Sequence, residues 1–172
     1  MLETDRLVLR KWRLEDRAQA AALLGDPDVM EFSDHGALTS AQQQDWFKKA
    51  LAVRRGDLLS GPWAIARKST GRAIGYITLS NDPKRTQPGD VEIGFRLARH
   101  AWGKGYATEA VTGLLRRTGD ISSLSRIVAI IDPLNTRSSR VLEKLGMSQI
   151  GTVMFDGYDH PDALYALKIS GP

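Results

Sequence analysis

The chain contains no cysteine among its 172 residues. This absence excludes disulfide bonds, thiolate metal ligands and a covalent intermediate carried on a cysteine. The three histidines, His35, His100 and His160, are isolated and lack the spacing of metal ligands. No Gly-x-Ser-x-Gly elbow of the serine hydrolases occurs either. We therefore expect no metal, and any chemistry must use other groups.

Long apolar runs are also missing. No segment approaches the roughly 18 apolar residues of a membrane span, so we expect a cytoplasmic protein with no membrane partner. The hydrophobic content of 42% is enough for one core, and we predict a single domain over residues 1–172. The net charge of +4 and the pI near 9.5 are a mild basic excess spread among 20 acidic residues. That excess suits an anionic cofactor, and it is the sole support for nucleic-acid binding, which we do not expect.

The hydrophobic pattern predicts a mixed α/β fold in the order β, α, α, β, β, β, α, β, α, β, β. The predicted strands are Leu7–Lys11, Trp63–Ala66, Ala73–Ser80, Asp90–Leu97, Arg126–Ile131, Ser148–Phe155 and Ala163–Ile169. The predicted helices are Leu14–Leu24, one after Thr39 that stops near Gly56, one that carries Ala107 to Leu115, and Asn135–Lys144. The triplet Gly25, Asp26 and Pro27 is expected to end the first helix.

A glycine-containing run lies where the Asp90–Leu97 strand passes into the central helix. Residues 102–110 read Trp-Gly-Lys-Gly-Tyr-Ala-Thr-Glu-Ala. Free N–H groups at a helix start favour an anion, and Gly103 and Gly105 let it approach the backbone without meeting a side chain. The run has neither the Walker pattern nor the third glycine of the dinucleotide fingerprint. A diphosphate site and an ordinary tight turn both explain it.

This run resembles the acetyl-CoA loop of the GCN5-related N-acetyltransferases, which is written Q/R-x-x-G-x-G/A. Gly105 and Ala107 stand at the two small positions, and Trp102 replaces the usual Gln or Arg. The resemblance assigns cofactor binding to Gly103, Lys104, Gly105, Tyr106, Ala107 and Thr108. It also implies that the fold is a mixed, mostly antiparallel sheet flanked by helices. In that fold the fourth and fifth strands splay apart, and the pantetheine arm lies between them.

Two further segments carry the resemblance over nearly the whole chain. Residues 2–10 and 135–147 look like the RimJ/RimL-like branch, which acetylates ribosomal-protein N-termini. The implied function is acetyl transfer from acetyl-CoA to a primary amine by direct attack in a ternary complex, with a protein N-terminal α-amine as acceptor. Alternative acceptors are small-molecule amines such as polyamines or antibiotics, and a non-catalytic acyl-CoA-binding module is a further alternative. A homodimer is compatible with the sequence, which does not specify an oligomeric state.

Glu92 is the candidate general base. It alternates with the apolar residues of its strand and so points to the opposite face, together with Arg96. A partly buried carboxylate there could take the ammonium proton directly or through water. The alternative is an exposed ion pair between Glu92 and Arg96.

Ser138 and Asn135 are the candidates on the last helix. The spacing of Ser138 from Val141, Leu142 and Leu145 puts its hydroxyl on the inward face. The resemblance implies that it donates to the departing CoA thiolate. Many relatives have a tyrosine acid where this chain has Leu142, so either Ser138 serves or the thiolate leaves unassisted. A bond from Ser138 to its own preceding turn is the alternative. Asn135 could cap the helix or, as the resemblance implies, bind the pantetheine amide.

The remaining assignments rest on the resemblance and on charge. The resemblance places the oxyanion at a backbone N–H near Leu97. Arg137, Arg140 and Lys144 could meet the 3′-phosphate, or they could be solvated surface charge. Five acidic residues fall in two loops that the family places around the acceptor groove, where they would attract a cationic amine or simply be polar loop residues. These are Glu31, Asp34, Asp156, Asp159 and Asp162.

Overall fold

The computed structural model describes residues 1–53, 59, 61–118 and 124–168. This part of the chain forms one eight-stranded sheet in the order β1-β2-β3-β4-β5-β6-β8-β7. The strands are β1 (Leu2–Glu3), β2 (Leu7–Arg10), β3 (Trp63–Arg67), β4 (Ala73–Ser80), β5 (Asp90–Leu97), β6 (Arg126–Ile131), β7 (Ser148–Val153) and β8 (Asp162–Lys168). The helices are α1 (Arg17–Leu24), α2 (Pro27–Met30), α3 (Ser40–Leu51), α4 (Tyr106–Thr118) and α5 (Thr136–Lys144), with short 3₁₀ turns at Leu14–Asp16 and Arg99–Ala101.

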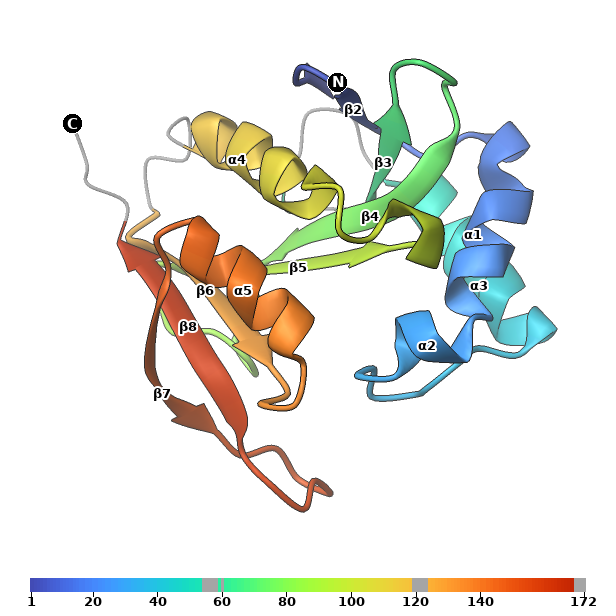
Figure 1. Ribbon diagram of the computed structural model, residues 1–172. Coiled ribbons are helices and arrows are strands. Elements are labelled where there is room, and N and C mark those ends of the chain that lie inside the picture. Colours follow the sequence, from blue (N-terminus) through green and yellow to red (C-terminus); the bar gives the residue numbers. More distant parts are fainter. Residues whose placement is uncertain (54–58, 60, 119–123, 169–172) are drawn as a thin grey trace.

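Helices cover both faces of the sheet (Figure 1). On one face α4 contributes Ala110, Val111 and Leu114 to the main core, and α5 contributes Leu142. On the other face α1 and α3 pack against the first strands through a smaller cluster. That cluster comprises Trp12, Ala20, Phe47, Ala50, Ala64 and Ala73. The predicted mixed α/β fold is confirmed.

The predicted element order is also confirmed, and the differences lie in short elements. The sequence pattern predicts neither β1 nor α2, which have two and four residues. The triplet Gly25, Asp26 and Pro27 ends α1 as predicted, since α1 stops at Leu24 with Gly25 as its C-cap, but Asp26 is also the N-cap of α2 and Pro27 its first residue. Helix α3 ends at Leu51, before the predicted stop near Gly56, a residue outside the described part of the chain. The predicted last strand residue, Ile169, also lies outside it.

The sheet divides between β5 and β6, the one parallel pair among the described strands. Only residues 90–92 of β5 pair with residues 126–128 of β6. Beyond Glu92, β5 continues against β4 as far as Leu97, while β6 continues against β8 as far as Ile131. Thus β5 stays paired with β4 and β6 with β8, while β5 and β6 separate from each other. These are the fourth and fifth of the predicted strands, so the predicted splay is confirmed.

A close backbone contact holds the far end of β5 against β4. Gly75 lies opposite Leu97. A Cβ at Gly75 would lie 2.1 Å from the Arg96 carbonyl oxygen and 2.5 Å from Leu97 Cδ2. Only glycine therefore lets the two strands pair this closely where the sheet divides.

In the described part of the chain, no helix is long and apolar enough to cross a membrane.

We predict that Gly75→Ala lowers the free energy of unfolding by about 1–3 kcal/mol, because the added methyl group must displace backbone. Gly151→Ala in β7 is the matched control, since no atom of the described residues beyond Gly151 and its two chain neighbours lies within 4 Å of its Cβ position. That substitution should raise stability by about 0.4–1 kcal/mol through the unfolded chain. Urea unfolding of both variants measures the difference. If Gly75→Ala were as stable as the unaltered chain, β4 and β5 could separate enough at this point to accommodate a methyl group.

Candidate active site

A cleft of about 770 Å³ opens where β5 and β6 part. Its walls come from both halves of the sheet and from the segments that follow the diverging strands. Of the predicted site residues, the cleft is lined by Glu92, Leu97, Gly103, Gly105, Tyr106, Ala107, Thr108, Asn135 and Ser138. Lys104 is not among its lining residues. Residues chosen from separate motifs thus meet in one cavity.

The glycine loop has the backbone shape that a tight anion cradle requires. Gly103 and Gly105 have φ angles of 70° and 77°, in the left-handed region that favours glycine. Apart from Gly103 and its two chain neighbours, no atom of the described residues lies within 4 Å of the Cβ position of Gly103. The 13-residue helix α4 begins directly after this loop at Tyr106. Its first N–H groups and the loop backbone therefore fit a diphosphate.

The N-terminal segment holds this loop in place. Arg6 pairs with Glu109 of α4 at 2.6 Å (Nε to Oε2), and its Nη1 donates to the Lys104 carbonyl at 3.0 Å. The Arg6 guanidinium also lies 4.6 Å from the centre of the Tyr106 ring. Lys104 thus contributes its carbonyl to the anchoring of the loop.

The end of β5 presents an unpaired backbone edge to the cleft. The Ala98 N–H donates to the Ile74 carbonyl at 2.9 Å. Hydrogen bonds alternate along an antiparallel ladder, so the neighbouring Leu97 turns its N–H and C=O away from β4, toward the gap. The Trp102 indole N–H donates to that Leu97 carbonyl at 2.7 Å. The Leu97 N–H is thus available to an oxygen in the cleft.

Helix α5 brings two predicted residues to the opposite wall. The Asn135 side chain accepts a hydrogen bond from the Ser138 backbone N–H at 3.1 Å, so Asn135 caps the helix. The Ser138 hydroxyl makes no hydrogen bond to the described residues, unlike Ser139, whose hydroxyl donates to the Thr136 carbonyl. The expected alternative, a bond from Ser138 to its own turn, does not form. Its hydroxyl can therefore serve a ligand.

Three cations of α5, Arg137, Arg140 and Lys144, line the cleft beside the glycine loop. The Arg137 guanidinium lies 4.1 Å from the centre of the Trp102 ring. Together with the loop backbone and the Leu97 edge, these cations fit an elongated anionic cofactor with amide groups. These groups thus remain the candidate contacts for CoA.

Glu92 lies at the vertex of the gap, where the β5–β6 pairing ends. Its side chain is only 13% exposed, and both of its oxygens accept hydrogen bonds from Arg85, at 2.7 and 2.8 Å. The alternative pair with Arg96 does not form. Arg96 instead contacts Met30 Sδ, the Tyr76 hydroxyl and the Phe32 carbonyl. Arg85 also lies over the Phe155 ring, so three segments meet around this carboxylate.

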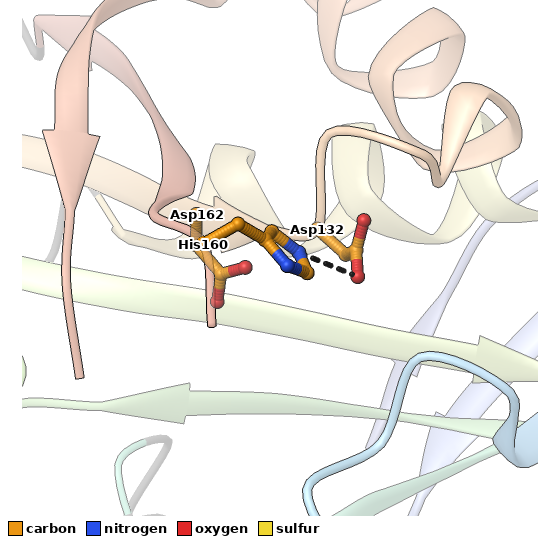
Figure 2. A group of neighbouring side chains, drawn as sticks. All are labelled: Asp132, His160 and Asp162. Atoms are coloured by element: carbon orange, nitrogen blue, oxygen red, sulfur yellow. Dashed lines mark hydrogen bonds and ion pairs between the residues drawn. The ribbon is translucent and has the colours of Figure 1, made fainter. Parts of the chain in front are cut away.

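Carboxylates gather on the β6–β8 side of the cleft. Figure 2 shows His160 directed at Asp132, with the Asp162 carboxylate beside it. His160 Nε2 lies 3.2 Å from Asp132, and Nδ1 lies 2.6 Å from Asp159. Burial, and then the nearby charge of Asp132, raise the pKa of Asp162. The cleft is negative here, which suits a cationic ligand.

The same group bears on the expectation of no metal. The ligand atoms of Asp132, His160 and Asp162 lie within 4.8 Å of one another and could hold a metal ion. Hydrogen bonds to Asp159 and then Asp132 raise the pKa of His160, so an imidazolium also balances these carboxylates. This contribution to stability is present below the ordinary histidine pKa and is lost as the pH rises through the raised value. The absence of a metal stays a prediction.

Two residues from the two halves face each other across the cleft: Tyr158, in the loop between β7 and β8, and Asp34, in the loop between α2 and α3. The interaction with the Asp34 carboxylate, and then burial, raise the pKa of Tyr158 to about 12. Both residues line the cleft, as do Arg85 and Asp132. No motif in the sequence marks Tyr158, Arg85 or Asp132, so none of them is predicted as a site residue. The one feature that could have identified them is their place in loops after or between strands that end at the same edge of the sheet.

The geometry agrees with comparisons to known proteins. An acetyltransferase (GNAT) domain model matches residues 6–148. The chain is 34% identical over 170 residues to the protein YkkB of Bacillus subtilis, covering 97% of this chain and 95% of that one.

Two solved structures show the same fold. The GNAT-family acetyltransferase of Bacillus anthracis superposes with a TM-score of 0.81 at 26% identity, covering 97% of each chain. The aminoglycoside acetyltransferase AAC(6')-Ib, solved with coenzyme A, superposes with a TM-score of 0.71 at 23% identity, covering 94% of each. A family model that spans most of the chain, together with a cleft of this form, shows that this chain belongs to the GNAT acetyltransferases and is an acetyl-CoA-dependent N-acetyltransferase.

Proposed function

We propose that the acceptor is a primary amine that attacks the acetyl group directly within a ternary complex, and that it is a protein N-terminal α-amine. The observation that carries the proposal is that Glu92 and Ser138 line one cleft from the two sides of the sheet's gap. The RimJ/RimL-like segments at residues 2–10 and 135–147 support the peptide acceptor. The chain has no thiol for a covalent relay, which supports direct attack.

The binding residues divide along the cofactor. Acetyl-CoA supplies the acetyl group as an activated thioester. The loop Gly103–Thr108 and the start of α4 would hold the diphosphate through backbone N–H groups. The free amide end of Asn135 would bind the pantetheine arm. The Leu97 N–H would stabilise the negative charge that develops on the carbonyl oxygen.

Glu92 would accept the proton of the attacking ammonium. An ionised carboxylate has about four lone-pair sites, and Arg85 occupies two of them in this structure. The remaining sites can receive the proton directly or through a water molecule. Arg85 holds the carboxylate in one orientation at the vertex of the gap. Ser138, whose hydroxyl has no partner among the described residues, would donate a hydrogen bond to the departing thiolate, which then takes its proton from solvent.

A small amine with several positive charges is a second candidate acceptor. Asp34, Asp132 and Asp162 line the cleft and could bind more than one ammonium group. The similar fold of AAC(6')-Ib, an aminoglycoside acetyltransferase, agrees with this alternative.

The acceptor is tested by mass spectrometry after incubation with labelled acetyl-CoA, using N-terminal peptides and an amine library that includes polyamines and aminoglycosides. We expect label on peptide α-amines. Label on small amines alone would favour the second candidate acceptor. No transfer to any amine would contradict both candidates.

Glu92→Gln should lower kcat/KM by about 10²–10⁴, because the amide cannot accept a proton, while CoA binding survives.

Ser138→Ala should lower kcat and kcat/KM equally, because its hydroxyl would act only once the thiolate forms. Ser139→Ala is the matched control on the same turn, where the hydroxyl bonds the Thr136 carbonyl instead. It should leave turnover unchanged. Steady-state kinetics and melting temperatures of both variants separate the roles. If Ser138→Ala loses stability with full turnover, the hydroxyl belongs to packing and the thiolate leaves unassisted.

A further inference from the structure

Arg137 has two partners that belong to different parts of the site. Its guanidinium lies on the Trp102 ring, 4.1 Å from the ring centre, and its Nη2 lies 3.2 Å from Glu31 Oε2. Trp102 directly precedes the glycine loop, and Glu31 directly follows α2 on the acceptor side. One cation thus joins the phosphate-binding loop to the acceptor loop, across the mouth of the cleft.

The ion pair is weak enough to exchange. The side chains of Glu31 and Arg137 are 54% and 53% exposed, and such pairs contribute little to stability. A phosphate group forms stronger, charge-assisted hydrogen bonds with a guanidinium than one distant carboxylate oxygen does. Trp102 can keep its contact with Arg137 while the guanidinium changes its anionic partner. A phosphate bound at the glycine loop would therefore compete with Glu31.

The neighbouring charges favour the same exchange. Arg140 and Lys144 line the cleft on the same helix, so an anion there meets three cations. The carboxylate of Asp28, on α2, is paired with Arg99. Asp28 therefore cannot take the place of Glu31 at Arg137 without breaking its own ion pair. Once Arg137 turns to a phosphate, Glu31 remains at the mouth of the cleft with its charge uncompensated.

We infer that Glu31 and a phosphate of CoA compete for Arg137, and that cofactor binding thereby frees the Glu31 carboxylate to attract the cationic acceptor. The inference rests on the proposed function, since it requires both a CoA site and an amine acceptor. It makes Glu31 a residue that couples the two sites, so that each ligand strengthens the binding of the other.

The competition is tested by titration calorimetry with CoA. Glu31→Gln should lower the dissociation constant about two- to fivefold, because it removes a competitor worth no more than an exposed ion pair. Asp28→Asn is the matched control. It makes the same charge change on α2, in a pair with 56% and 59% exposed side chains, and should leave CoA affinity unchanged. In an Arg137→Met background, Glu31→Gln should have no effect.

Dephospho-CoA locates the phosphate. Loss of the Glu31→Gln effect with this probe assigns the 3′-phosphate, and its retention assigns the diphosphate. Equal CoA affinities of Glu31→Gln and Asp28→Asn, or an effect that persists without Arg137, would overturn the inference while leaving the proposed function intact. Failure of the unaltered chain to bind CoA would overturn the proposed function, and the inference with it.

Kinetics with the acceptor identified above provide the second readout. Glu31→Gln should raise the KM of that acceptor severalfold with little change in kcat, while it tightens CoA. A merely structural role would weaken both ligands together. An unchanged acceptor KM would remove Glu31 from the acceptor site and overturn the coupling.

Discussion

The parting of β5 and β6 after three paired residues is the constraint on which the rest of the site depends. Each strand stays paired with its outer partner, so the gap cannot close unless β4 or β8 moves together with β5 or β6. The gap leaves the Leu97 edge unpaired, places Glu92 at its vertex, and lets α4 and α5 present their first turns to the same cavity. A substrate arm with its own amide groups can complete the interrupted ladder.

The larger elements followed from local patterns in the sequence. Alternation placed Val91 and Ile93 in the core and Glu92 on the opposite face, and helical spacing identified the buried side of α4. Element ends were less predictable, because a terminal residue is fixed by its partner strand. Helix α2 was missed although Asp26 and Pro27 are also a start signal. A four-residue helix has too few positions to show a period.

The candidate site was predictable where a motif names its residues. Glycine at positions 103 and 105, Asn135 and Ser138 come from runs with fixed spacing, and the fold brings them to one cleft. The charge partners were not predictable in this way. Glu92 pairs with Arg85 from the preceding loop, and not with Arg96 on its own strand. The ion-pair partner of a long side chain depends on which loops fold next to it. The alternating pattern of a strand carries no information about those loops.

Trp102 replaces a polar residue of the family motif, yet its side chain makes two specific contacts in the site. Its indole N–H binds the Leu97 carbonyl, and its ring carries the Arg137 guanidinium. The Trp102 indole, a chromophore, thus contacts both the unpaired backbone edge of β5 and the Arg137 guanidinium. Any rearrangement of charge around Arg137 would reach that ring as a change of local field, so the site has an intrinsic optical reporter.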